Sequence, residues 1–348
     1  MSRQIALDTI WLKPTRRLAH TEYSLEYHTE YIRNKTGLHP LAPMAVQHLY
    51  ELWGIDLIWF TNDGLHQDWA RYGRSTNMGH AKYAANGSDM QKAEECPFAT
   101  VEEVWSFDAV KEYGLPDAGE QVVAYERIVQ CARENNPEQL VTGGYYKTII
   151  SGAIQAFGWN ILLMALSDPR RMEKVLDSFF RYTLFHMEAW AKTSAEVIIQ
   201  HDDFVWARGA FMRPEIYRKV IIPRYAELWK PLRAAGKKVL FCADGNLEEF
   251  AEDVVQAGAD GLVFEPCNNF SSMVERFSQS TVLVGSAVDC RDMTFGTWDQ
   301  VRASMDRTFE LAHNCKGLIF AVGNHIPANV PHDMMDKYID YLQANWSF

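Results

Sequence analysis

Side chains that can bind a metal or move a proton follow two neighbouring apolar runs of the chain. Cys242 and Asp244 follow the run at residues 239–241, and Glu265 follows the run at residues 261–264. Each run predicts a strand, and the helix-like segment between them makes the two strands parallel. Carboxyl ends of parallel strands share one edge, where α/β enzymes place their sites. A thiol and two carboxyl groups at this edge suit zinc binding or acid–base chemistry.

Other polar side chains follow the remaining apolar runs and are expected at the same edge. His201, Asp202 and Asp203 form an acid–base group, because adjacent carboxylates raise the pKa of one another. For each residue a structural alternative stays open, since a strand cysteine is often a small core residue and an aspartate often caps the next segment. We predict as catalytic Asp63, Asp202, Asp203 and Glu265, as substrate-binding His201, Tyr145, Tyr146, Asn246 and Asn324, and as metal ligands Cys242, Asp244, Glu265 and His325.

Alternating strands and helices have to bring these side chains together. Helices are predicted to begin at Asp168-Pro169 and Arg213-Pro214 and to cover residues 247–256. The alternation predicts an α/β fold, a single (β/α)8 TIM-like barrel. A doubly wound open sheet is the alternative, but no glycine-rich phosphate-binding loop follows a strand. The predicted strands are residues 17–22, 56–61, 139–143, 195–200, 238–241, 261–264, 281–285 and 317–321.

The composition indicates a globular protein rather than a nucleic-acid-binding or membrane protein. The chain has 348 residues and is 47% hydrophobic, which allows a large core. Its formal net charge of −11 and the lack of a basic cluster argue against nucleic acid and anionic membrane as partners. The six cysteines include no CxxC pair, and no apolar run is long enough for a membrane span. We expect a cytoplasmic protein.

One domain is the simplest organisation of the chain. Residues 1–348 are predicted to form this domain, with residues 1–50 as an N-terminal extension over the barrel. The polar and poorly periodic stretch at residues 71–97 is expected to cover the mouth of the barrel as a long loop. A homodimer is left open.

Several segments, in this order, resemble the uroporphyrinogen decarboxylase-like superfamily. Residues 201–223 contain an Asp-Asp pair, then Arg-Pro-Glu-Ile-Tyr and a later proline, where the family has Asp-Asp, Ser-Pro-Glu-x-Tyr and a proline. Residues 239–246 are similar to the family's strand followed by His-x-Cys-Gly-Asn or His-x-Asp-Gly-Asn. Residues 257–262, 284–286 and 323–327 complete the set. The resemblance implies a single (β/α)8 barrel.

The resemblance implies either decarboxylation or corrinoid-dependent methyl transfer. True uroporphyrinogen decarboxylases carry an N-terminal Arg-Gln-Ala-Gly-Arg segment, which this chain lacks, although Asp63 lies where the family has its aspartate. Zinc-dependent methyltransferases of the superfamily bind the metal through His-x-Cys and a later cysteine. Here Cys242 takes the histidine position, Asp244 the first cysteine position, and Asn324 lies near the last. The thiol-methylating site is therefore altered.

From this pattern we expect a methyltransferase that moves a methyl group from a small methoxy- or methylamine-type substrate to a corrinoid protein. The corrinoid (cobalamin) would be carried by a separate partner, because the chain has no Asp-x-His-x-x-Gly motif. Zinc is a possible cofactor, and a metal-free acid–base pocket is the alternative. Two other functions stay open: a lyase or decarboxylase acting on a carboxylated small molecule, and a non-catalytic barrel that binds a ligand.

Overall fold

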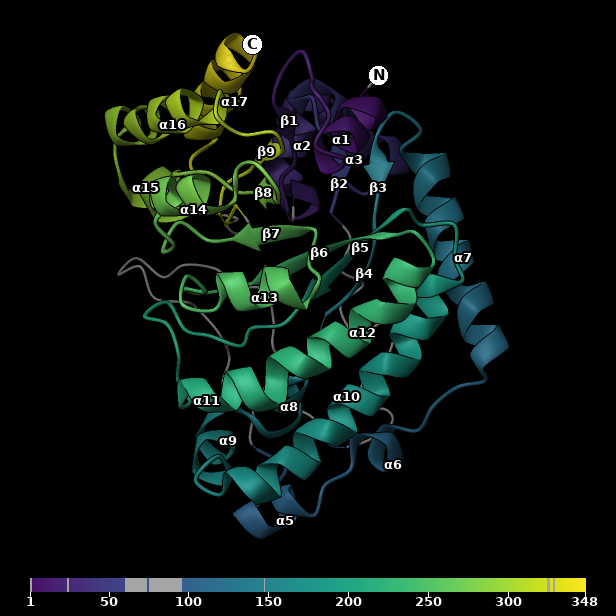
Figure 1. Cartoon of the computed structure of the whole chain (residues 1–348). Coiled ribbons are helices and arrows are strands. Elements are labelled where there is room, and N and C mark those ends of the chain that lie inside the picture. Colours follow the sequence, from purple (N-terminus) through teal and green to yellow (C-terminus); the bar gives the residue numbers. More distant parts are fainter. Residues whose placement is uncertain are drawn as a thin grey trace.

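Parallel strands alternate with helices along the whole chain (Figure 1). A computed structural model describes residues 2–23, 25–59, 74, 96–146, 148–323, 326–327 and 329–348. Every run that the sequence predicts as a strand contains one. The strands are β1 (Ala19–His20), β2 (Leu57–Ile58), β3 (Leu140–Val141), β4 (Gly143–Tyr145), β5 (Val197–His201), β6 (Lys238–Ala243), β7 (Gly261–Phe264), β8 (Val282–Val284) and β9 (Leu318–Phe320).

The strands close into a barrel. Seven of them pair in parallel in the order β1-β9-β8-β7-β6-β5-β4, and β2 pairs with β3. Only Thr142 separates β3 from β4, so these two continue one another. The amide of Asp56 donates to the carbonyl of His20 (2.9 Å), and the hydroxyl of Thr21 donates to the carbonyl of Leu57 (2.7 Å). These bonds join β1 to β2, which confirms the (β/α)8 barrel and rules out the open sheet.

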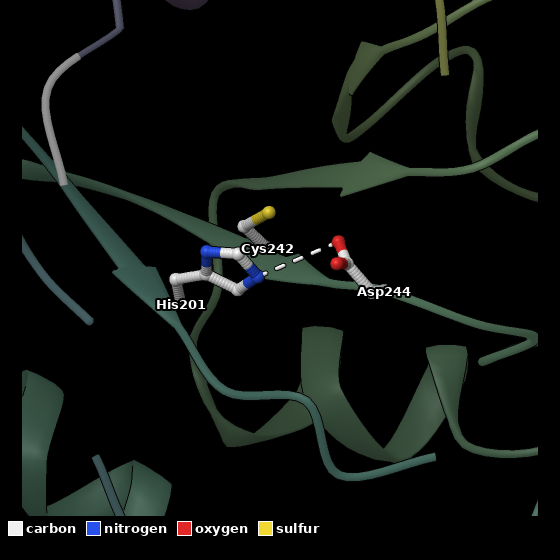
Figure 2. A group of neighbouring side chains, drawn as sticks. All are labelled: His201, Cys242 and Asp244. Carbon is white, nitrogen blue, oxygen red and sulfur yellow. Dashed lines mark ion pairs between the residues drawn. The ribbon is translucent and has the colours of Figure 1, made fainter. Parts of the chain in front are cut away.

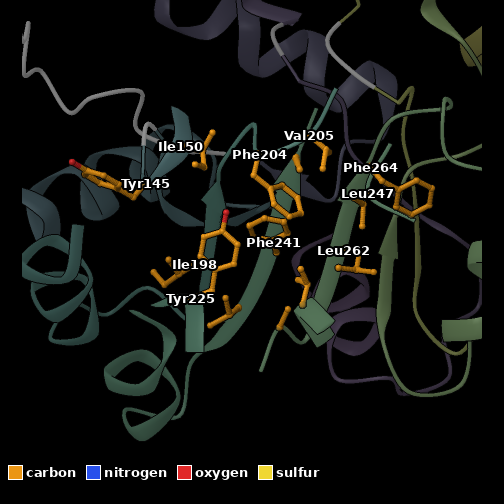
Figure 3. Packing of buried hydrophobic residues seen from close by; sticks show 14 of the residues in the cluster. Tyr145, Ile150, Ile198, Phe204, Val205, Tyr225, Phe241, Leu247, Leu262 and Phe264 are labelled. Atoms are coloured by element: carbon orange, nitrogen blue, oxygen red, sulfur yellow. The ribbon is translucent and has the colours of Figure 1, made fainter. Parts of the chain in front are cut away.

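Alternation along the strands divides the core into two layers. Val197 and Ile199 of β5 belong to the cluster of apolar side chains inside the barrel, together with Cys242 of β6. Their neighbours Ile198 and Phe241 belong to the larger cluster between the barrel and its helices (Figure 3). Because successive strand residues point to opposite faces, one strand supplies both layers. Both faces are therefore apolar, as expected for buried parallel strands.

Helices cover the outside of the barrel, and α10 and α12 lie side by side across β4 to β6 (Figure 1). Asp168 caps α10 as predicted, since its carboxylate accepts from the amide of Arg171 (3.2 Å). The helix predicted over residues 247–256 begins only at Ala251, because Asn246 closes a turn by accepting from the amide of Glu248 (3.1 Å). The described helices are α1 (Ser2–Ile10), α2 (Thr29–Thr36), α3 (Pro43–Trp53), α5 (Val101–Trp105), α6 (Ala109–Tyr113), α7 (Ala118–Asn135), α8 (Ile150–Phe157), α9 (Trp159–Ala165), α10 (Pro169–Ala191), α11 (Pro214–Ile216), α12 (Ile222–Ala234), α13 (Ala251–Ala257), α14 (Phe270–Phe277), α15 (Cys290–Phe295), α16 (Trp298–Ala312) and α17 (His332–Asn345), with a 3-10 turn at Leu25–Tyr27 and a π-helical turn at Tyr217–Ile221.

Helix α1 lies at the amino end of the barrel, where its side chains Ile5, Ala6 and Ile10 join the interior cluster. Two residues of the first fifty also form strand β1, so this segment contributes to the barrel wall. The division into a single domain stays a prediction. Among the described residues, every helix is too short or too polar to cross a lipid bilayer.

The end of the chain lies against the seam between β1 and β2. The amide of Leu18 donates to the carbonyl of Trp346 (2.8 Å), and the Arg17 guanidinium lies 4.0 Å from the centre of the Trp346 ring. Arg17 also donates to both carboxylate oxygens of the fully buried Asp56 (2.6 and 2.7 Å). A bidentate ion pair and a cation–π contact therefore clamp the seam.

Candidate metal and acid–base site

Three potential metal ligands meet where β5 and β6 end. His201 is the last residue of β5 and pairs in register with Cys242 of β6, while Asp244 follows β6 by one residue. Nitrogen, sulfur and oxygen atoms of these three side chains all lie within 4.8 Å of one another. The His201 Nε2 and Asp244 Oδ1 atoms are 3.5 Å apart (Figure 2). We call His201, Cys242 and Asp244 the ligand triad.

The carboxylate of Asp203 meets the imidazole of the triad at the same nitrogen, Nε2, that faces Asp244. Asp203 Oδ1 lies 2.8 Å from His201 Nε2 and also accepts from the amide of Asp244 (3.2 Å). The Tyr146 hydroxyl donates to Asp203 Oδ2 (2.8 Å), and the Tyr146 ring stacks on His201. Asp203 is itself held by Ser151, whose hydroxyl oxygen accepts from the Asp203 amide (2.5 Å). The imidazole is thus fixed in position and in plane.

Opposite charges decide the protonation of this group. Burial alone lowers the pKa of His201, but the charge of Asp203 and the hydrogen bonds to Asp203 and Asp244 outweigh it and raise that pKa well above its usual range. Burial likewise opposes ionisation of Asp203, yet the neighbouring His201 lowers the Asp203 pKa below its usual value. Burial raises the pKa of the Cys242 thiol to about 11. Without a metal, the site therefore pairs an imidazolium with a carboxylate beside a neutral thiol.

The donor set of the triad fits zinc. Zinc takes imidazole nitrogen, thiolate sulfur and carboxylate oxygen, and catalytic zinc sites use three protein ligands. Zinc bonded to nitrogen and oxygen at roughly 2.0–2.1 Å in a tetrahedron holds these two atoms about 3.4 Å apart. The observed 3.5 Å between His201 Nε2 and Asp244 Oδ1 agrees with that geometry, and zinc at this nitrogen would displace the contact with Asp203 Oδ1. Cys242 is buried, whereas the Asp244 side chain is 45% exposed, so a substrate has access from the Asp244 side.

Asp202 lies on the opposite face of its strand from Asp203. Its carboxylate accepts from the amides of Ile149, Ile150 and Ser151 (3.2, 3.0 and 2.6 Å) at the start of α8 and from the Tyr225 hydroxyl (2.7 Å). The residue is fully buried, and burial raises its pKa despite these donors. Asp202 therefore anchors α8 and lies away from the triad.

The other predicted site residues divide between the site edge and the core. Tyr145 is fully buried and stacks on His186 at 4.9 Å between ring centres, in the layer between barrel and helices (Figure 3). Glu265 lies at the end of β7, where its Oε2 accepts from the amide of Gly245 (2.6 Å). Asn246 follows Gly245 on the loop after β6, and its side-chain amide donates to the carbonyl of Cys267 (3.0 Å). Asp63, Asn324 and His325 lie outside the described residues, so their predicted roles stay predictions.

Two residues that the sequence did not single out, Ser151 and Asn268, support the site residues through hydrogen bonds. The Ser151 hydroxyl oxygen accepts from the Asp203 amide, as described above. The buried Asn268 donates to the carbonyls of Gly245 and Glu265 (both 2.9 Å) and accepts from the amide of Leu247 (2.8 Å). It therefore ties the loop after β6 to the loop after β7. A buried asparagine next to a strand end is the only signal of this role in the sequence.

Comparisons with known proteins agree with the fold. A family described as uroporphyrinogen decarboxylase matches residues 89–344. A methyltransferase from Methanosarcina mazei is similar in structure, with a TM-score of 0.65, 15% sequence identity, and coverage of 99% of this chain and 98% of that chain. A xylose isomerase-like TIM barrel protein from Mycobacterium smegmatis gives a TM-score of 0.36 at 12% identity, over 80% of this chain and 99% of that chain. No curated protein sequence matches. At 15% identity, the Methanosarcina protein supports the fold alone.

Proposed function

This chain belongs to the uroporphyrinogen decarboxylase family, and on that premise we propose that it is a methyltransferase that takes a methyl group from a small methylated compound. The methyl acceptor in this proposal is a reduced corrinoid on a separate protein. The observation that carries the proposal is the ligand triad, because a nitrogen, sulfur and oxygen donor set at the barrel mouth suits a Lewis-acid metal. The fold shared with a methyltransferase is consistent with it.

The triad residues would hold zinc, which when bound supplies a Lewis acid to the methyl-bearing heteroatom. His201 and Cys242 approach from the buried side, and Asp244 from the exposed side. In the metal-free site Asp203 bonds to the same His201 Nε2 that would bind zinc, so we assign Asp203 and Tyr146 the role of orienting the imidazole before the metal binds. Asp202 has a positioning role through α8.

The reaction moves one methyl group and one proton. The bond from the methyl carbon to the heteroatom breaks, the methyl group passes to the corrinoid, and the heteroatom keeps the bonding electron pair. That heteroatom then needs a proton. We assign its delivery to Glu265, whose carboxyl group lies at the neighbouring strand end beside the loop that carries Asp244.

Methyl transfer to free cob(I)alamin tests the proposal. The purified protein, loaded with zinc, is mixed with reduced cobalamin and either methoxylated arenes or methylamines, and formation of methylcobalamin is followed by its absorbance. Cys242→Ser is expected to reduce the rate on the order of 100-fold or more, since loss of even an outer-shell partner of a metal site costs roughly 10–100-fold. Cys315→Ser, far along the chain on the outer layer, is the matched control.

If neither class of compound methylates cobalamin, methyl transfer is wrong. Release of carbon dioxide from carboxylated substrates would then favour the lyase that the sequence also left open. The corrinoid partner, the small-molecule substrate and a homodimer remain proposals at this stage.

A further inference from the structure

An open surface cavity of about 500 Å³ lies beside the loop that follows β5, and Trp159, Trp206, Ala207 and Arg208 line it. Trp159 and Trp206 meet at 5.5 Å between ring centres and 60° between planes. Phe211 supports both rings, at 5.4 Å from Trp159 and 5.5 Å from Trp206. We call this cavity the indole pocket.

A tight turn holds the exposed part of the indole pocket. The amide of Trp206 donates to the carbonyl of Gly209, and the amide of Gly209 donates back to the carbonyl of Trp206 (both 2.8 Å). Gly209 has φ +98°, a conformation that favours glycine. The turn thus presents Ala207 and Arg208 at its tip, and Trp206 is 44% exposed. The Trp206 ring is therefore held in one place at the surface, in contact with Trp159 and Phe211.

The turn lies directly against the loop of the ligand triad. The amide of Asn246 donates to the Trp206 carbonyl (2.8 Å). A Cβ atom on Gly245 would lie 2.6 Å from the Trp206 carbonyl carbon, so the two backbones touch. Gly245 directly follows Asp244, and Trp206 comes three residues after Asp203. The indole pocket and the triad therefore share one edge of the barrel.

Arg208 decides the charge of the ligand. Arg208 is exposed, and the described part of the chain gives it no hydrogen bond or ion pair, which leaves its guanidinium open to a ligand. A guanidinium binds a carboxylate in a bidentate manner, and indole rings bind a flat aromatic ring. Indole rings alone also attract methylammonium cations, but the positive charge of Arg208 repels them. The pocket therefore favours an aromatic anion over an amine.

We propose that the indole pocket binds an aromatic carboxylate, with the ring against Trp159 and Trp206 and the carboxylate on Arg208. The assignment of that compound as the methyl donor, a methoxylated aromatic acid, rests on the proposed methyl transfer. The binding step itself does not. The inference narrows the substrate from methoxy or methylamine compounds to methoxylated aromatic acids.

Calorimetric titration of the full-length protein with 4-methoxybenzoate, methoxybenzene and trimethylamine tests the pocket. We expect 4-methoxybenzoate to bind more tightly than the other two compounds. Arg208→Gln should weaken its binding at least roughly tenfold, the loss expected when a charged hydrogen bond is removed. Arg208→Lys should retain part of the affinity, and Trp206→Ala should weaken 4-methoxybenzoate and methoxybenzene alike. Arg171→Gln is the control, because Arg171 is an exposed arginine that lies over Trp105 at 4.6 Å, on the outer helices and away from the indole pocket.

Two results separate this inference from the proposed function. Binding of 4-methoxybenzoate that is unchanged in both Arg208→Gln and Trp206→Ala, or tighter binding of trimethylamine, would overturn the pocket assignment whatever the methyl-transfer assay gives. Binding that depends on Arg208 without any methyl transfer to cobalamin would keep the pocket and refute the proposed methyltransferase. Circular dichroism of each variant checks that the fold is intact.

Discussion

Tyr146 stacks on His201 with 4.2 Å between ring centres and 25° between the ring planes. The Tyr146 hydroxyl also donates to the carboxylate that holds the His201 Nε2 atom. One side chain therefore fixes the imidazole twice, through its ring and through the carboxylate. Neither contact requires Tyr146 to touch a substrate.

The Tyr146 hydroxyl can be removed without loss of the ring. Tyr146→Phe is expected to keep the stacking on His201 and to lower kcat by about tenfold, the effect of a lost outer-shell hydrogen bond. KM should change little, because the hydroxyl points to Asp203 rather than to the open side. Tyr341→Phe, which removes a similar hydroxyl–carboxylate bond to Asp306, is the control. A large change in KM with kcat unchanged would mean that Tyr146 binds the substrate.

The neighbouring carboxylates Asp202 and Asp203 should respond differently to substitution. Asp202→Asn replaces one of the two acceptor oxygens at the start of α8 with an NH2 group that faces backbone N–H donors, so the free energy of unfolding should fall by about 2 kcal/mol. Asp203→Asn should mainly abolish activity, because it removes the charge beside His201. Urea denaturation and the methyl-transfer assay, applied to both variants, check this division. Equal loss of stability in the two variants would contradict it.

Metal content is the direct measure of the ligand triad. We expect the wild-type protein to bind zinc at one ion per chain and Cys242→Ser or Asp244→Ala to lose it. Cys315→Ser should keep the full amount. Elemental analysis after dialysis gives the stoichiometry, and retention of zinc in both triad variants would exclude this set of ligands.

The buried His186 makes stability depend on pH. Burial lowers the pKa of His186 from 6.5 to about 3, so the native protein keeps this ring neutral while the unfolded chain takes up a proton below pH 6.5. The contribution of the neutral His186 to the free energy of unfolding is fully present above pH 6.5. It is lost as the pH falls toward 3, by about 1.4 kcal/mol per pH unit. In His186→Phe, which keeps a ring next to Tyr145, this part of the slope should vanish. Denaturation at pH 7.0 and 5.5 measures it, and an unchanged slope would contradict the assignment.

The fold could be predicted because buried parallel strands are continuous apolar runs. Residues 238–241 and 261–264 are such runs, and the structure has β6 and β7 there. The parallel pairing of the two strands was enough to predict that Cys242, Asp244 and Glu265 lie at one edge of the barrel. Side-chain positions depend on the neighbours of each strand, which a sequence does not give. The place of His201 beside Cys242 depends on the register of β5 on β6 in this way.

The orientation of individual side chains could not be predicted, because both faces of these strands are apolar. Tyr145 and Tyr146 differ by one residue, yet Tyr145 lies among the helices and Tyr146 lies on His201. In the same way, the Asp202 carboxylate binds amides at the start of α8, whereas the Asp203 carboxylate binds His201. A strand with one polar face would reveal which residues point inward, whereas a strand buried on both sides does not.

Side chains clamp the seam between β1 and β2, but little backbone pairing joins these two strands. One backbone hydrogen bond, from Asp56 to His20, and the ion pair of Arg17 with Asp56 hold this seam. In contrast, β5 and β6 pair over five residues. Local unfolding begins where backbone pairing is sparse. Amide hydrogen exchange should therefore be fastest at this seam, on the far side of the barrel from β6. A transiently opened molecule would still hold His201 and Cys242 side by side, because the pairing of β5 with β6 stays intact.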